Sequence, residues 1–329
     1  MEILITGSNG YLGSRLSFEL AKQGHQVTAV CHSKPIKDSE WASQMKEILI
    51  GDIRDQNFVE QICSQKVDCI IHLISLDHHQ SNGDPKNVSD INVLATWTLL
   101  DLLSKNGFTG KFLYFSTIHV YGKVPNINID ETYPTSPQNP YGLTHKLSEE
   151  ICDFYNQTSD ISCINVRLSN SFGNPVFVEN KCWKLVINEL CLTAIFNKEI
   201  ILMSDGSPLR DFIHYSDVVA YTETLITTSQ NQSKYVFNMS SGETFSMLEI
   251  ALKVKKVFED KYNEKIKVYV NKDQEVEVSE SSNIKKYTID NSKISTIADF
   301  KLKKMESGID ELFDYLELNK EQLKIHLDL

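Results

Sequence analysis

The chain has 329 residues, of which 33 are Lys or Arg and 44 are Asp or Glu, so its net charge is −11. This acidic balance argues against a nucleic-acid partner, because nucleic-acid-binding proteins concentrate basic residues on one face. Hydrophobic residues make up 41% and charged residues 23% of the chain, which is typical of a folded globular protein. No apolar stretch approaches the roughly 20 residues of a membrane span, so we expect a cytoplasmic protein with no membrane partner.

The first half of the chain alternates between short apolar runs and stretches of helical period. The pattern predicts strands at residues 2–6, 26–31, 48–50, 68–74, 112–116 and 163–168, with helices at 10–23, 91–104 and 141–155. Such alternation predicts an α/β fold, a doubly wound parallel sheet with helices on both faces. Ligands of these sheets bind at the carboxyl ends of the strands.

The second half of the chain has a different character. Residues 174–180 and 204–208 are expected to be loops, residues 265–270 and 275–281 short strands, and residues 247–258 and 308–316 helices. We interpret this half as a smaller α+β domain that packs on the sheet. The predicted division is a dinucleotide-binding domain at 1–168, with a returning segment near 212–235, and a mainly substrate-binding domain at 169–329.

The cysteines do not indicate a metal site or a disulfide framework. They stand apart at positions 31, 63, 69, 152, 163, 182 and 191, with no CxxC or CxxH pair among them. His78 and His79 are adjacent, and without further ligands they are better read as the lip of a pocket than as a metal pair.

A glycine-rich turn follows the first predicted strand directly. It reads Gly7-Ser8-Asn9-Gly10-Tyr11-Leu12-Gly13 and opens the first helix. Glycines at this spacing permit a tight turn and a close approach of the backbone to a pyrophosphate, and the helix N-terminus offers free N–H groups. Because the turn lies between a strand and a helix of an alternating chain, it indicates a dinucleotide site.

Further motifs follow in a characteristic order. They are Gly51-Asp52-Ile53-Arg54-Asp55, Ile71-His72-Leu73, Phe115-Ser116-Thr117-Ile118-His119-Val120-Tyr121-Gly122, Asn139-Pro140-Tyr141-Gly142, Arg167-Leu168-Ser169-Asn170 and Arg210-Asp211-Phe212-Ile213-His214. Together with the glycine turn they resemble the extended short-chain dehydrogenase/reductases, the NAD-dependent epimerase/dehydratase superfamily that modifies nucleotide sugars. The resemblance implies a Rossmann-type fold, a nicotinamide cofactor, a nucleotide-sugar substrate and a homodimer built on helices 91–104 and 141–155.

The resemblance also assigns residues to the cofactor. The expected contacts are Gly7, Asn9, Gly10, Tyr11, Leu12, Gly13, His32, Ser33, Lys34, Asp52, Ile53, Leu73, Ile74, Asn92, Tyr141 and His145. NAD-using members place an acidic residue at the end of the second strand, where this chain has Cys31. Because His32, Ser33 and Lys34 can bind a 2′-phosphate, we expect NADP(H) in preference to NAD(H), which remains the alternative.

The same resemblance identifies Tyr141 as the proton-transfer residue and Thr117 as its hydroxyl partner. The family usually lowers the pKa of the tyrosine with a lysine four positions later, but this chain has His145 there, and Lys146 follows one position late. The fourth position lies about 40° from Tyr141 around a helix and the fifth about 140°, so His145 is expected to face the cofactor. The alternatives are an ordinary surface histidine, or a π-bulge that turns Lys146 inward.

Three functions remain open at this stage. Ile118 and His119 stand where the family's 4,6-dehydratases carry Asp and Glu, which makes dehydration an unfavoured reading. The missing acidic residue and the missing lysine favour an NADP(H)-dependent 4-keto reductase of a nucleotide sugar for surface polysaccharides. A C4 epimerase with bound NAD is the first alternative, and a catalytically weakened cofactor-binding protein is the second.

Four residues are expected to contact the substrate. His119 follows the catalytic threonine, and Asn170 resembles a residue that binds phosphate or sugar. Arg210 resembles the family's diphosphate-binding arginine, although a surface pair with Asp211 is the alternative. Trp183 lies in the expected base-binding loop, where a core position is the equally favoured reading.

Overall fold

A computed structural model describes residues 1–33, 39–125, 127–228, 236–272, 274–276, 286–298 and 300–327. Its strands are β1 (Glu2–Thr6), β2 (Gln26–Cys31), β3 (Glu47–Ile50), β4 (Cys69–His72), β5 (Lys111–Thr117), β6 (Asn128–Ile129), β7 (Ser162–Leu168), β8 (Asn170–Phe172), β9 (Glu199–Ile201), β10 (Leu209–His214), β11 (Val236–Met239), β12 (Thr244–Ser246), β13 (Lys267–Val270), β14 (Gln274–Glu275) and β15 (Thr288–Ile289). The strands predicted in the first half of the chain are all present.

Helices follow most of the strands. The α-helices are α1 (Tyr11–Lys22), α2 (Glu40–Gln44), α3 (Gln56–Cys63), α4 (Pro85–Ser89), α5 (Ala95–Lys105), α6 (Pro140–Thr158), α7 (Val186–Asn197), α8 (Tyr215–Thr227), α9 (Met247–Tyr262), α10 (Ser292–Ser295), α11 (Met305–Leu318) and α12 (Lys320–Leu327). Short 3₁₀ turns are η1 (Gln80–Asn82) and η3 (Ile118–Tyr121), and η2 (Asp90–Leu94) is a π-helical turn. The predicted helix 91–104 therefore begins with a π turn, while α6 is regular and carries no such bulge.

The centre of the fold is a seven-stranded sheet in the order β11-β7-β5-β4-β1-β2-β3. Every neighbouring pair in it is parallel, and the order reverses between β1 and β4. Parallel strands need helical crossovers that cover both faces of the sheet. This is the predicted Rossmann-type arrangement. Its edge strand β11 follows the predicted returning segment 212–235, and the domain boundaries themselves remain a prediction.

Two apolar layers hold the helices to this sheet. One layer packs Leu16 and Leu20 of α1 and Val218 of α8 against β1. The other packs Leu99 and Leu103 of α5 against the opposite face. All five of these side chains are at least 97% buried. The period-2 and period-3.6 apolar patterns of the sequence thus meet in a three-layer core.

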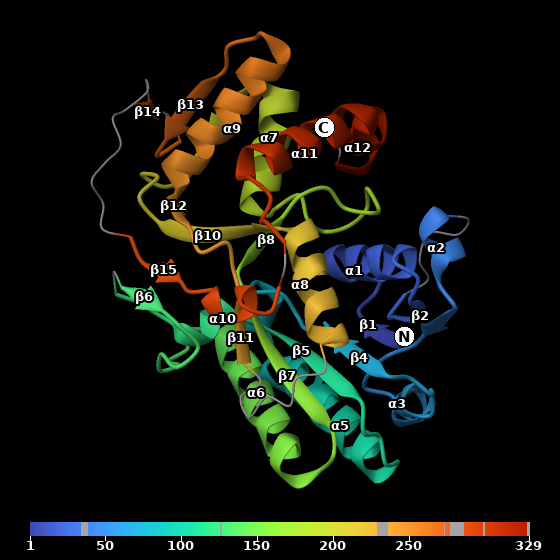
Figure 1. The fold of residues 1–329 in the computed structure, drawn as a ribbon. Coiled ribbons are helices and arrows are strands. Elements are labelled where there is room, and N and C mark those ends of the chain that lie inside the picture. The colour runs from blue at the N-terminus through green and yellow to red at the C-terminus, as the bar shows by residue number, and fades with distance from the viewer. Residues whose placement is uncertain are drawn as a thin grey trace.

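The second half of the chain builds the other end of the molecule, where α7, α9 and α11 stand together (Figure 1). A small sheet, β12-β10-β8, lies between that helical group and the large sheet. Further pairings join β14-β13-β9 and β15-β6. The predicted strand 275–281 is shorter in the structure, because β14 ends at Glu275 and residues 277–281 lie outside the described residues.

Candidate active site

The glycine turn has the geometry that a pyrophosphate requires. Gly7 adopts a φ of +74°, which glycine tolerates best, and the N–H of Gly10 donates to the Gly7 carbonyl at 2.9 Å. A Cβ at Gly13 would lie only 2.1 Å from that carbonyl oxygen, so helix and turn pack closely because residue 13 is glycine. No side chain caps the N-terminus of α1, and its first turn holds no acidic residue. Its free N–H groups therefore suit an anion.

The neighbouring residues support this turn. The Asn9 side-chain amide donates to the Ser33 hydroxyl at 3.0 Å, and the Tyr11 hydroxyl donates to the Gly173 carbonyl at 3.0 Å. Asn92 is fully buried, and its amide group accepts from the Leu76 N–H at 2.7 Å and contacts protein hydroxyls. Its polar atoms thus fasten the loop after β4 to the helical layer, which is a supporting role beside the predicted cofactor site.

The end of β2 carries no carboxylate, as predicted. Cys31 is 1% exposed, and the exposed His32 has its Nε2 3.8 Å from a carboxylate oxygen of Asp52. Arg54 hydrogen-bonds that carboxylate and holds the pKa of Asp52 at about 2, so Asp52 is anionic. Ile53 beside it is buried. Lys34, which the NADP(H) prediction uses, lies outside the described residues.

Tyr141 stands in the first turn of α6 and faces Thr117 at the end of β5. Asn139 caps this helix by accepting the Gly142 N–H at 2.8 Å, which fixes the start of α6 beside the strand ends. Burial raises the pKa of Tyr141 to about 12, and a hydrogen bond with Thr117 acts in the opposite direction. The phenol is therefore neutral at physiological pH, and it can donate a proton.

His145 lies beside Tyr141, as the helical spacing predicts. Their ring centroids are 4.5 Å apart, and His145 is 2% exposed, which rules out the surface alternative. Lys146 points elsewhere and pairs with Glu150 at 2.7 Å. Burial, followed by the neighbouring His119 and His72, lowers the pKa of His145 to about 3. His145 is thus a neutral imidazole, where the family resemblance would place an ammonium group.

One nitrogen of this imidazole is engaged and the other is not. Nδ1 of His145 lies 2.8 Å from the hydroxyl oxygen of Tyr114, which is itself 1% exposed. Nε2 is buried and has no hydrogen-bond partner within the described residues. An unpaired buried polar atom carries a free-energy cost, so Nε2 is suited to a ligand that supplies a partner. Sequence reasoning missed Tyr114, because nothing in the apolar run of β5 indicates a helical partner.

A pocket of about 360 Å³ opens beside the phenol of Tyr141. The imidazoles of His78 and His119 stack at 5.8 Å, and their ring centroids lie 6.2 Å and 5.7 Å from that of Tyr141. Burial lowers the pKa of His119 to about 4, so its ring is neutral near pH 7. Asn170 lines the same pocket, which therefore joins the predicted proton-transfer residues to two of the predicted substrate contacts.

The other substrate predictions fare differently. Arg210 is exposed and takes part in no ion pair within the described residues, and the alternative pair with Asp211 is wrong because Asp211 is buried and bonds Ser169 and Ser241. Trp183 is 4% exposed and donates its indole N–H to the Val178 carbonyl at 2.8 Å, so it is a core residue and not a base platform. Its exposed neighbours Lys181 and Lys184 line the pocket instead.

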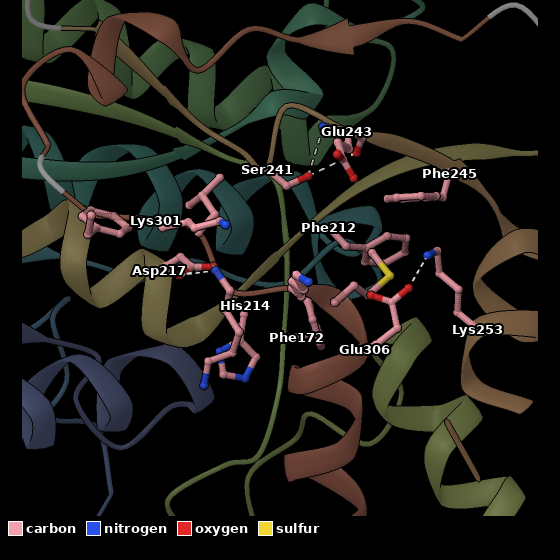
Figure 2. Close-up of a pocket in the computed structure, with 15 residues that line it drawn as sticks. Phe172, Phe212, His214, Asp217, Ser241, Glu243, Phe245, Lys253, Lys301 and Glu306 are labelled. Carbon is pink, nitrogen blue, oxygen red and sulfur yellow. Dashed lines mark hydrogen bonds and ion pairs between the residues drawn. The ribbon is translucent and has the colours of Figure 1, made fainter. Parts of the chain in front are cut away.

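A second cavity, of about 470 Å³, lies between α8, α9 and α11 (Figure 2). Phe172 of β8 forms part of its wall, whereas Ser169–Ser171 line the first pocket. Lys253 forms an ion pair with Glu306, and Asp217 accepts the Lys303 backbone N–H at 3.1 Å. His214 also lines this cavity, and its buried Nε2 has no hydrogen-bond partner within the described residues, although its Nδ1 contacts the Ser216 hydroxyl at 2.8 Å. The larger cavity therefore combines paired charges with one unpaired imidazole nitrogen.

Comparisons with known proteins agree with this geometry. The chain is 27% identical over 249 residues to a putative UDP-glucose 4-epimerase of Methanocaldococcus jannaschii, covering 75% of this chain and 79% of that protein. It is 29% identical over 286 residues to UDP-glucose 4-epimerase 4 of Oryza sativa, covering 78% and 76%.

Solved structures share the fold. A UDP-glucose 4-epimerase structure superposes with a TM-score of 0.80 at 22% identity, covering 97% of this chain and 98% of its own. A UDP-glucuronic acid 4-epimerase from Bacillus cereus, solved with UDP-glucuronic acid and NAD, gives 0.78 at 22% identity, covering 97% and 99%. No described helix has the length and apolar character needed to cross a membrane. The profile of the NAD dependent epimerase/dehydratase family matches residues 3–240, and the chain belongs to that family.

Proposed function

We propose that this protein is a C4 epimerase of a nucleotide-linked sugar and that it works with bound NAD. The observation that carries the proposal is the half-buried Tyr141 phenol, hydrogen-bonded with Thr117 at the wall of a pocket that Asn170 and Lys181 also line. The relatives reported above are named UDP-glucose 4-epimerases, and a structural neighbour was solved with a UDP-sugar and NAD. These names favour the epimerase over the reductase expected from the sequence.

The chain's own residues divide the work as follows. The turn from Gly7 to Gly13 and the N-terminus of α1 would hold the pyrophosphate, and Leu73 and Ile74 would border the nicotinamide side. When bound, the nicotinamide accepts and returns a hydride at the sugar carbon. In its phenolate form, a small fraction at neutral pH, Tyr141 would take the proton of the C4 hydroxyl as the hydride leaves C4 and would return it as the hydride returns, with Thr117 as its hydrogen-bond partner. His145 meets a ribose hydroxyl through its unpaired Nε2.

Cationic side chains at the pocket mouth suit the diphosphate of the substrate. Lys181 and Lys184 line the pocket, and Arg210 lies close enough to His119 to influence its charge. We assign the diphosphate to these three residues, the sugar to His119 and Asn170, and the carbon beside Tyr141 to C4. Ile118 carries no ionisable group beside Thr117, which leaves 4,6-dehydration without the usual acid next to the threonine.

One observation favours the second candidate, an NADP(H)-dependent 4-keto reductase. Because burial raises the pKa of Tyr141 to about 12, its neutral form prevails at pH 7, and reduction needs a proton donor at this place. The neutral His145 adds no positive charge that would favour the phenolate. This reductase would serve surface-polysaccharide synthesis.

The deciding experiment begins with the protein as purified. Denatured protein is analysed for released NAD(H) and NADP(H), and the intact protein is incubated with UDP-glucose and UDP-galactose without added cofactor. Interconversion of the two sugars with NAD in the extract supports the epimerase. NADPH consumption with a 4-keto-sugar nucleotide supports the reductase. Cofactor binding with neither activity supports the weakened binding protein.

The homodimer is also a proposal. Five large side chains of η2, α5 and α6 are exposed although they are apolar: Leu94 46%, Trp97 50%, Leu143 50%, Leu147 45% and Phe154 54%. Other apolar side chains of these helices, Leu99 and Leu103 among them, are buried against the sheet. Light scattering should give about twice the monomer mass of 37.5 kDa, and Phe154→Asp should shift the protein toward the monomer.

A further inference from the structure

The environment of His145 contains a feature that the proposed function leaves unused. The imidazole touches Tyr141 on one side and the Tyr114 hydroxyl on the other, 2.8 Å from Nδ1. Tyr114 lies on β5 and His145 on α6, so the contact joins the sheet to the catalytic helix. Both side chains are at least 98% buried, so the contact is shielded from bulk solvent.

The chemistry of the two groups decides which of them donates. A phenol O–H is a better donor than a neutral imidazole N–H, and an imidazole nitrogen is a better acceptor than a phenolic oxygen. The Ser148 hydroxyl beside Tyr114 donates to the Asn92 carbonyl at 2.8 Å, so toward Tyr114 it can only accept. Of the two acceptors that the Tyr114 hydroxyl meets, the imidazole nitrogen is the stronger. Tyr114 therefore donates to Nδ1, which leaves the imidazole proton on Nε2.

We propose that Tyr114 is a positioning residue that holds His145 as the Nε2–H tautomer, turned so that Nε2–H donates to a ribose hydroxyl of the dinucleotide. The pair then replaces one charged side chain: His145 supplies the donor, and Tyr114 supplies the fixed orientation that a flexible ammonium does not need. The inference rests on the proposed function only in taking the dinucleotide as the ligand. It requires neither a particular sugar nor a particular reaction.

Burial agrees with this assignment. It lowers the pKa of His145 to about 3, so the ring stays neutral across the physiological range and keeps one proton to place. It also keeps the Tyr114 hydroxyl protonated by raising its pKa well above the ordinary value. A neutral ring with two nitrogens in different surroundings has one favoured tautomer.

The first test reads the ring directly. Long-range ¹H–¹⁵N correlation spectra of ¹⁵N-labelled protein should show His145 as the neutral Nε2–H tautomer from pH 5 to pH 9, with and without NAD. Tyr114→Phe should shift the ring toward Nδ1–H or a mixture. Tyr155→Phe is the matched control, since that hydroxyl lies on the same helix as His145 but contacts Asp101 instead. A wild-type ring in the Nδ1–H form overturns the proposal.

The second test is a double-mutant cycle on NAD affinity measured by calorimetry. Tyr114→Phe should weaken NAD binding about 5- to 10-fold in the wild-type background. In a His145→Lys background the same change should alter the dissociation constant less than about 2-fold, because an ammonium needs no tautomer. Equal losses in both backgrounds, or no loss in the first, contradict the proposal.

Failure of this inference can be told apart from failure of the proposed function. Both tests use the cofactor alone, so protein that turns over no nucleotide sugar still reports the tautomer and the coupling. Conversely, an active epimerase whose Tyr114→Phe variant keeps its tautomer and its NAD affinity retains its function and loses the positioning role. Circular dichroism of each variant checks the fold, and the wild-type spectrum decides the tautomer even where a variant does not fold.

Discussion

The two cavities to which β8 contributes a wall differ in the side chains that surround them. The larger, of about 470 Å³, contains Lys253 in an ion pair with Glu306. The smaller, of about 360 Å³, is lined by Tyr141 and Thr117, and next to Tyr141 lies His145, whose buried Nε2 has no partner in the part of the chain that the structure describes. Each cavity thus adjoins a buried imidazole Nε2 without a partner among the described residues, that of His214 at the larger and that of His145 at the smaller. Neither volume nor an unpaired nitrogen distinguishes the smaller cavity, whereas the proposed proton-transfer pair of Tyr141 and Thr117 does.

The largest effect is expected when the Tyr141 hydroxyl is removed from the smaller pocket. Tyr141→Phe should lower kcat by about 10³-fold, because general acid–base catalysis contributes of this order. NAD affinity should stay within about 2-fold, since the phenol hydroxyl handles the proton on the sugar. Steady-state kinetics and calorimetry measure the two effects. A variant that retains a tenth of wild-type turnover would remove Tyr141 from the proposed mechanism.

The next largest effect concerns the glycine turn. Gly13→Ala places a Cβ only 2.1 Å from the Gly7 carbonyl oxygen, and neither backbone segment can move without opening the turn. Dissociation constants for NAD should rise at least about 10-fold, with a loss of about 1–3 kcal/mol in unfolding free energy. Denaturant titration and calorimetry give both values. Unchanged NAD affinity would show that this turn does not carry the pyrophosphate.

A third prediction uses acid sensitivity. His145 has a folded pKa of about 3 against roughly 6.5 unfolded, so below pH 6.5 the unfolded chain binds a proton that the folded chain does not. Its contribution to stability therefore falls as the pH falls, by about 2 kcal/mol between pH 7 and pH 5. His72 and His214, whose pKa values burial also lowers to about 3, act in the same direction. Asp211 and Asp217, raised to about 6, act in the opposite one.

The wild type and a His145→Gln variant share the other four groups, so the difference between their pH-dependent losses of stability isolates His145. His145→Gln carries no titrating ring and should lose about 2 kcal/mol less than the wild type between pH 7 and pH 5. Chemical denaturation at each pH measures this. Parallel losses in the two proteins would show that the ring is protonated in the folded state, and the neutral-imidazole account of the pocket would fail.

Local patterns allowed much of the fold and the cofactor turn to be predicted. Buried apolar runs such as 26–31 and the glycine spacing at 7–13 are read from neighbouring residues, and helical geometry alone placed His145 rather than Lys146 beside Tyr141. Contacts between distant segments escaped prediction. Tyr114 meets a residue 31 positions later, and β8 has only three residues, whose pairing with β10 is decided by tertiary packing.

Trp183 illustrates a different limit. The family resemblance placed Trp183 in a base-binding loop, and stacking on a base and a core position were equally favoured. The indole lies in the core, where its N–H donates to the Val178 carbonyl five residues earlier. The NADP(H) prediction depended on Cys31 and on Lys34. Cys31 is buried at the expected place, and Lys34 is outside the described residues. The cofactor released from the purified protein tests the preference for NADP(H).

The smallest expected effect belongs to the larger cavity. Lys253→Met keeps the apolar stem and removes the charge that pairs with Glu306 and lies 5.0 Å from the centre of the Phe245 ring. Both interactions are partly exposed, so their loss should reduce the unfolding free energy by no more than about 1 kcal/mol. Turnover and NAD affinity should stay within about 2-fold of wild type, because Tyr141 does not line this cavity. A 10-fold loss of turnover at unchanged stability would instead mean that β8 transmits changes from one cavity to the other, and the contrast drawn between them would be wrong.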